Sequence, residues 1–149
     1  MSSNWLTDLL QSVVFQTVIS GLLVFSLSEI LQKFFLEPIK NYKEVVGKID
    51  NRLKYYSNTI NNSVSPDAMR EPSRILRALS CDLEATHKQI PFRMPFAIFK
   101  IVPKQLAVGI AASDLIFLHN AGGKFDQMDH NYKKIQEIRR LLNIKELEY

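Results

Sequence analysis

The chain has 149 residues, of which 46% are hydrophobic and 23% charged, and its 19 Lys and Arg against 15 Asp and Glu give a net charge of +4. These values are typical of one folded domain and exclude a disordered tail. Five Gly, six Pro and one Cys exclude a collagen-like chain and a disulfide scaffold, because a single thiol forms no bridge within the chain.

The N-terminal region is strongly apolar. Residues 1–36 contain only Asp8, Glu29 and Lys33 as charged residues, and the run from Leu9 to Ser28 has no charge over 20 residues. As a helix rising ~1.5 Å per residue, this run spans ~30 Å, the thickness of the hydrocarbon layer of a bilayer. We therefore predict a transmembrane anchor over 1–36 and a helical domain over 37–149.

The alternative for this run is a wholly buried core helix of a soluble bundle. A cleaved signal peptide is disfavoured, because the start MSSNWLTD has no Lys or Arg and no small-x-small cleavage site follows the run. The basic residues all follow the span, the first four being Lys33, Lys40, Lys43 and Lys48. By the positive-inside rule, the N-terminus lies outside and the C-terminal domain is cytoplasmic, with Trp5 at the outer interface.

The four lysines are candidates for contact with anionic headgroups, because they follow the anchor directly. A solvated helix face explains them as well. Nucleic acid is another class of partner for a basic stripe with nearby aromatic residues, but the position below an anchor makes lipid the simpler partner, and we expect no nucleic acid.

The predicted span has two different faces. Six small or hydrogen-bonding residues fall in one half of a helical wheel: Ser12, Gln16, Thr17, Ser20, Gly21 and Ser28. Thr17 and Gly21 form a small-xxx-small pair, which favours self-association in the membrane. A single span that tolerates a few polar residues explains the pattern too, and a pore lined by this face is a weaker third reading, because no central charge marks an ion path.

After Pro38, apolar residues recur with heptad spacing at Ile39, Tyr42, Val46, Ile49, Leu53, Tyr56 and Ile60. This seam predicts a long amphipathic helix. It suits either an antiparallel bundle or a parallel coiled coil between chains. In the second case Ile49, Leu53 and Tyr56 are candidate self-association residues.

Turn formers and two prolines over 61–72 predict a loop. A helix follows whose apolar face is Leu76, Leu79, Leu83 and Ile90, ending at Pro91. A further helix begins near Pro103 and ends at Gly122 and Gly123. The last helix starts near Asp126 or Asp129, both acceptable N-caps. The predicted fold class is thus all-α, with one transmembrane helix and a cytoplasmic bundle of about four helices.

The segment 91–103 contains three prolines but is too apolar for an exposed loop. We expect it to fold over the bundle core. The alternative is a Phe-rich segment that dips into the inner leaflet beside Arg93, Lys100 and Lys104.

No motif for catalysis or cofactor binding is recognised. Gly122-Gly123-Lys124 lacks the spacing of a phosphate loop, and the cluster of Asp126, Asp129 and His130 lacks a metal-ligand spacing. Cys81 has no nearby His and is expected to be a buried or inert thiol. We therefore expect no enzyme, no catalytic residue, no cofactor and no metal; a helical enzyme would need a site built from residues distant in sequence.

The strings FFLEPIK, IDNRLKYYSN and RILRALSCDLEA, together with the layout of IAASDLIFLHN, resemble a functionally uncharacterised family of small bacterial single-pass membrane proteins with a helical cytoplasmic part. The resemblance implies the bacterial inner membrane as location. It transfers no catalytic or binding residue.

The predicted function is a membrane-tethered interaction module that self-associates or holds a partner at the cytoplasmic face of the membrane. Its expected partners are the lipid bilayer, further copies of the chain and a cytoplasmic protein. The alternative is an oligomeric effector that perturbs the membrane, such as a toxin or defence component. The half-polar span and the Phe-rich segment motivate this second reading.

Overall fold

The computed structural model describes residues 12–62, 64–91, 96–97, 101–121 and 123–144, and all regular elements within these ranges are helical. The predicted all-α fold class is therefore confirmed. The chain divides into two compact units, Met1–Glu37 and Pro38–Tyr149. Trp5 and the first three residues of the predicted span, 9–11, lie outside the described residues.

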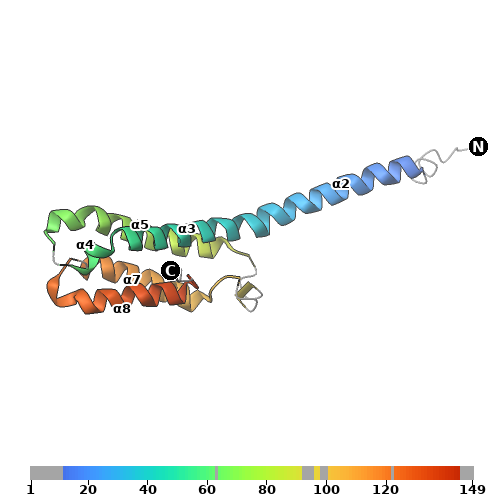
Figure 1. The fold of residues 1–149 in the computed structure, drawn as a ribbon. Coiled ribbons are helices and arrows are strands. Elements are labelled where there is room, and N and C mark those ends of the chain that lie inside the picture. Colours follow the sequence, from blue (N-terminus) through green and yellow to red (C-terminus); the bar gives the residue numbers. More distant parts are fainter. Residues whose placement is uncertain (1–11, 63, 92–95, 98–100, 122, 145–149) are drawn as a thin grey trace, which may run out of the picture. The chain divides into compact units, whose positions relative to one another are not determined.

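In the described part of the first unit, α2 (Val13–Leu31) passes directly into a π-helical turn, η1 (Gln32–Leu36) (Figure 1). No residue of α2 is buried. Its 19 residues correspond to ~28 Å of helix. Within the described residues one helix, beginning at Val13, is long and apolar enough to cross a membrane.

The described residues of the second unit form four long helices: α3 (Glu37–Tyr55), α5 (Pro66–Gln89), α7 (Gln105–Ala121) and α8 (Met128–Leu141). A short helix, α4 (Ser57–Asn61), follows α3, and a 3₁₀ turn, η2 (Phe125–Gln127), precedes α8. The long helices run up and down beside one another as a bundle (Figure 1). This topology gives the unit two ends.

We call one end the Pro38 end, which contains Pro38, Ile90, Pro103 and Leu142, and the opposite end the turn end, which contains 62, 64–65, 121 and 123–127. The Pro38 end therefore collects the start of α3, the end of α5, the start of α7 and the end of α8. The turn end collects the two short connections. These two ends differ in how they are closed and in which side chains they expose.

The seam after Pro38 fills the core of the bundle. Tyr42, Ile49, Leu53, Tyr56 and Ile60 are buried, and Ile39 and Val46 are partly buried against the same core. The predicted face of α5 is buried as well, together with one face of α7 and of α8: Leu76, Leu79, Leu83, Ile90, Val108, Leu115, Leu118, Ile135 and Ile138. The heptad pattern thus serves an antiparallel bundle within one chain.

The predicted loop over 61–72 is wrong, because α5 already begins at Pro66. Ser65 is its N-cap, and the Ser65 hydroxyl accepts a hydrogen bond from the Ala68 N–H at 3.4 Å. Pro66 occupies the first helical position, where its missing N–H costs nothing. Ser, Pro and Asp open helices as readily as they form turns, so their composition misplaced this boundary.

The predicted N-cap of the last helix is also wrong. Gln127 holds the N-cap position of α8, without a capping hydrogen bond from its side chain. Asp129 lies in the first turn instead, where a carboxylate interacts favourably with the helix dipole. Asp126 lies in η2.

Gly123 closes the turn end and has a φ of +74°. Its N–H donates to the carbonyl of Ile60 at 3.1 Å, and its carbonyl accepts from the N–H of Val64 at 3.2 Å. A Cβ at this position would lie 2.9 Å from Cγ2 of Val64. The chain therefore needs glycine here both for the left-handed backbone and for the close approach of the 62–65 connection.

The burial of Leu53 leads to a test of the seam. Leu53→Ala should lower the free energy of unfolding by about 2–5 kcal/mol, because Leu53 is fully buried and its truncation leaves a cavity. Leu106→Ala is the matched control, because Leu106 is 76% exposed. Urea unfolding followed by circular dichroism in detergent, at two protein concentrations, measures both. A loss that disappears at the higher concentration would instead place the seam between chains.

Candidate functional site

Three polar side chains of α5 join it to α7 and the residues before it. They stand at every seventh residue, at Ser73, Ser80 and His87. The Ser80 hydroxyl is buried and donates to the carbonyl of Ala112 at 2.9 Å. The Ser73 hydroxyl donates to the carbonyl of His119 at 3.1 Å, and the His119 imidazole returns a bond from Nδ1 to the carbonyl of Ser73 at 3.0 Å.

The third bond of this series lies at the Pro38 end. His87 is buried, and its Nε2 lies 3.2 Å from the carbonyl of Pro103. Since a carbonyl only accepts, this nitrogen carries the hydrogen. The imidazole also packs against the ring of Tyr42 in α3, with 5.6 Å between ring centroids. His87 therefore holds α3, α5 and the start of the α7 segment together.

Charged and amide side chains fix α8. Lys134 pairs with the buried Asp114 of α7 at 2.8 Å, and the hydrogen bond that its ammonium donates to Asp114 raises the pKa of Lys134. Arg139 pairs with Asp50 of α3 at 3.3 Å. The fully buried Asn131 donates from Nδ2 to the carbonyl of Ile60 at 2.9 Å. These pairs were not foreseen; the one sequence signal for them is Asp114, a single acid within an apolar helix.

The predicted self-association pair of the span lies on the surface of α2. Thr17 and Gly21 are both exposed, and a side chain added at Gly21 would meet no atom within 4 Å. The Thr17 hydroxyl donates to the carbonyl of Val13 at 2.8 Å, and the hydroxyls of Ser20 and Ser28 bond in the same way to the carbonyls of Gln16 and Val24. These hydroxyls therefore have their hydrogen-bond partners within the helix. What this face presents to a neighbouring helix is small residues, not free hydrogen-bond donors.

The candidate self-association residues of the seam lie elsewhere than expected. Ile49 and Leu53 are fully buried in the second unit and Tyr56 is 7% exposed. The Tyr56 hydroxyl donates to Glu71 Oε1 at 3.0 Å. The pKa of Tyr56 is raised, mainly by burial and second by this bond. Because these side chains pack inside their own bundle, they have no surface for a second copy, and we withdraw them as assembly residues.

The four candidate lysines divide into two pairs. Lys33 and Lys48 form i, i+4 ion pairs with Glu29 at 3.0 Å and Glu44 at 2.9 Å. The bond from Lys48 lowers the pKa of Glu44. Lys40 and Lys43 are exposed near the start of α3. Surface ion pairs of this kind are weak, so an anionic surface can compete for Lys33 and Lys48. Together with the exposed Lys40 and Lys43, all four ammonium groups are accessible to such a surface.

Part of the Phe-rich segment is described. Val102 is 1% exposed and Phe96 is partly buried against the core, whereas Ile101 is 42% exposed. The N–H groups of Ile101 and Val102 both bond to the carbonyl of Phe96, at 2.9 and 3.3 Å. Residues 92–95 and 98–100, with Arg93 and Lys100, lie outside the described residues. The described part both covers the core and exposes an apolar side chain.

A groove of about 450 Å³ lies between the end of α5 and the start of α7. Lys88 and Glu84 line it from α5, and Leu106, Gly109 and Ile110 line it from α7. Leu106 is 76% exposed and Ile110 is 38% exposed. Exposed apolar side chains of α7 therefore line this groove, and no sequence motif indicated it.

The residues considered for metal or thiol chemistry are dispersed. Among the described residues, no three His, Cys, Asp or Glu side chains come close enough to hold a metal ion. His130 packs on Phe117, with 4.8 Å between ring centroids. Cys81 is exposed on the outer face of α5, so of the two expectations, a buried or an inert thiol, the first is wrong and the second stays a prediction.

In comparisons with known proteins, no family model, no curated protein and no solved structure matches the chain. The resemblance to small bacterial single-pass membrane proteins therefore stays a prediction.

Tyr42 leads to a test at alkaline pH. Its buried hydroxyl has no hydrogen-bond partner among the described residues, and burial raises its pKa well above the ordinary 10.0. The unfolded chain ionises at the ordinary pKa while the folded phenol stays protonated, so stability is lost as the pH rises from about 10 toward the raised pKa. Above pH ~10, Tyr42 should make the wild type lose up to about 1.4 kcal/mol of its free energy of unfolding per pH unit. We expect Tyr42→Phe to remove this part of the loss.

Urea unfolding in detergent over a series of alkaline pH values measures this slope. Tyr55→Phe is the control, because Tyr55 is 71% exposed. Equal slopes for the wild type and Tyr42→Phe would show that the phenol ionises without unfolding the bundle.

Proposed function

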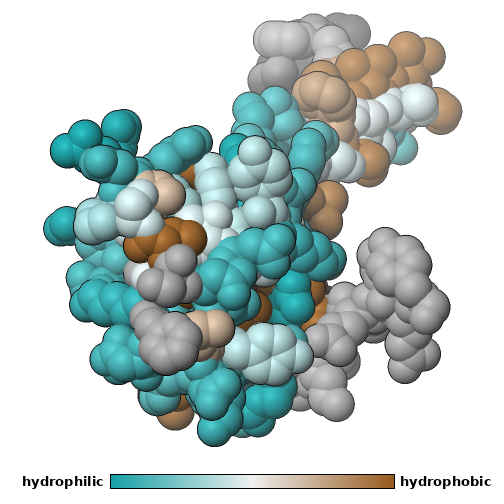
Figure 2. Space-filling view, turned by 60° about the vertical axis from the view of Figure 1, so that its left-hand side comes forward, coloured by the Kyte–Doolittle hydropathy of each residue, from teal (hydrophilic) through white to brown (hydrophobic). Residues whose placement is uncertain are grey.

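We propose that the chain is a single-pass membrane protein whose helical bundle is held at the cytoplasmic face of the bacterial inner membrane as an interaction module. One observation carries the proposal: α2 exposes its apolar side chains all round, whereas the second unit has a complete core of its own. A soluble helix of this composition is normally buried, and an exposed one indicates a membrane or another apolar surface. In Figure 2 hydrophobic residues gather along α2.

The energetics of α2 support insertion. Twelve of its 19 residues are Leu, Ile, Val or Phe. Each favours insertion near the bilayer centre by about 0.3–0.6 kcal/mol. The hydroxyls of Thr17, Ser20 and Ser28 bond to carbonyls one turn earlier, which lowers the cost of placing them in hydrocarbon.

The charges give the orientation. No Lys or Arg precedes α2, whereas Lys33, Lys40, Lys43 and Lys48 follow it. This asymmetry supports an orientation in which the bundle lies on the cytoplasmic side.

Self-association is assigned to the small face of α2, at Thr17 and Gly21. Since the Thr17 hydroxyl is occupied within its own helix, close packing of backbones at these small residues supplies the attraction. The seam residues Ile49, Leu53 and Tyr56 are not part of this assembly, because they are buried in their own bundle. The bundle surface remains free to hold a cytoplasmic partner.

Insertion and orientation can be tested with the native thiol. Cys81 is exposed on the bundle. We expect a membrane-impermeant maleimide to label Cys81 only after the cells are permeabilised, and to label a Cys81→Ser/Ser3→Cys variant in intact cells. Carbonate washing should leave the protein in the membrane pellet. Release of the chain by carbonate, or labelling of Cys81 in intact cells, would contradict the anchor or its orientation.

The self-association face can be tested by Gly21→Ile. A larger side chain at Gly21 keeps neighbouring backbones apart, so we expect association in membranes to weaken by roughly 1 kcal/mol, or about fivefold. Leu22→Ile is the matched control on the opposite half of the helix. Energy transfer between labelled copies in vesicles measures the change. Equal association of both variants would remove α2 from the assembly.

The membrane-perturbing effector makes a different prediction. If the chain is such an effector, its expression should abolish the membrane potential, and substitutions at Gln16 and Ser20 should prevent this loss. That result would favour the effector over the tethered module.

A further inference from the structure

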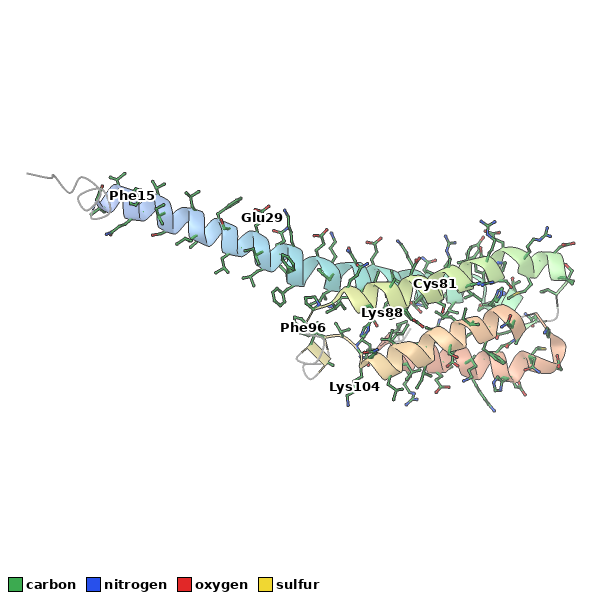
Figure 3. The ribbon with its side chains drawn as sticks, turned by 180° about the vertical axis from the view of Figure 1, so that it is seen from behind. Phe15, Glu29, Cys81, Lys88, Phe96 and Lys104 are labelled. Carbon is green, nitrogen blue, oxygen red and sulfur yellow. The ribbon has the colours of Figure 1, made fainter. Side chains whose placement is uncertain are left out.

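The Pro38 end of the second unit exposes apolar and cationic side chains together. Ile101 is 42% exposed and Leu106 is 76% exposed. Lys88 and Lys104 are exposed beside them. Figure 3 shows Lys88, Phe96 and Lys104 at this same end, on the last turn of α5, the connecting segment and the approach to α7.

One stretch of the sequence that passes through this end carries only basic charge. Between Glu84 and Asp114 the chain has no Asp or Glu, but it has four basic residues: Lys88, Arg93, Lys100 and Lys104. The turn end carries both signs, with Asp67, Glu71 and Asp126 among its acids and Arg70 and Lys124 among its bases. Figure 2 looks toward the turn end and shows a mostly hydrophilic surface there.

Helix α7 has an uncovered apolar stripe that begins at this end. Its sequence is apolar on nearly all sides, which is typical of a helix that is covered all round. Leu106, Gly109 and Ile110 nevertheless remain exposed along the groove that Lys88 lines from α5. A surface that complements this stripe must be apolar in its interior and negatively charged at its edge.

Chain connectivity brings one such surface within reach. Pro38 belongs to this end and is ten residues beyond Ser28, the last residue of the uncharged run. Ten helical residues rise ~15 Å. Only the headgroup region of the bilayer lies between the hydrocarbon layer and the bundle at this distance.

We propose that the Pro38 end of the bundle docks onto the anionic headgroups of the same membrane. Leu106 and Ile101 enter the boundary between headgroups and acyl chains, while Lys88 and Lys104 contact lipid phosphates and Lys40 and Lys43 add positive charge from α3. Glu84, which pairs with Lys88 at 3.2 Å, also lines the groove, so lipid phosphates compete with it for Lys88. This inference rests on the proposed anchor.

The experiment uses the full chain in vesicles and a Cys81→Ser background. An environment-sensitive fluorophore is attached at Gly109→Cys, since a side chain there meets no atom within 4 Å. A second sample carries it at Leu22→Cys to report insertion of the anchor, and a third at Asp67→Cys, at the turn end. Quenching by spin-labelled lipids is compared between phosphatidylcholine vesicles and vesicles that also contain phosphatidylglycerol.

We expect quenching at 22 in both lipids, quenching at 109 with phosphatidylglycerol, and none at 67. Lys88→Gln/Lys104→Gln should lower the ratio of docked to undocked bundle by about thirtyfold. The control Arg70→Gln/Lys124→Gln removes equal charge from the turn end and should leave the ratio unchanged. Circular dichroism verifies that each variant keeps its helices.

The outcomes separate the two proposals. Quenching at 22 without quenching at 109 overturns docking and leaves the anchor intact. The absence of quenching at 22 overturns the anchor, and docking with it. A blue shift at 109 without quenching by lipid also overturns docking and assigns the stripe to a second copy of the chain.

Discussion

The close approach of α5 to α7 is the constraint on which the bundle depends. Ser80 reaches the carbonyl of Ala112 only because the two helices lie side by side at small residues, and Ala111 and Ala112 are 0% and 1% exposed. Each such bond contributes about 0.5–1.5 kcal/mol, but a lost partner would leave a buried polar group unsatisfied and cost more. The bonds at Ser73, Ser80 and His87 therefore fix the register of α5 against α7 and its neighbouring segment, and they constrain where α3 and α8 pack.

The two ends of the bundle are closed in different ways. Backbone bonds of Gly123 and the side chain of Asn131 tie both connections at the turn end to Ile60. At the Pro38 end, His87 makes the bond to the carbonyl of Pro103, and Leu106 remains exposed beside it. The Pro38 end is the one that follows the apolar helix in the chain, and it is also the end that leaves apolar surface uncovered. This coincidence links the proposed anchor to the proposed lipid contact.

The polar side chains of the apolar helix and of the bundle have different kinds of hydrogen-bond partner. In α2 the hydroxyls of Thr17, Ser20 and Ser28 bond to carbonyls of their own helix, as a lipid-facing helix requires. In the bundle, short polar side chains bond across helices instead, and Asp114 meets Lys134. The first arrangement needs no neighbour, whereas the second holds neighbours together.

The sequence by itself determined the all-α class, the apolar helix near the N-terminus and the core faces of α3 and α5, because hydrophobic periodicity depends on helix geometry alone. It left open which surface the seam at Ile49 and Leu53 would cover, since an intrachain bundle and a coiled coil share the same spacing. Only the tertiary structure decided that question. It also decided the partners of Ser80, His87 and Asn131, because these are backbone carbonyls, which every residue carries and no sequence pattern distinguishes.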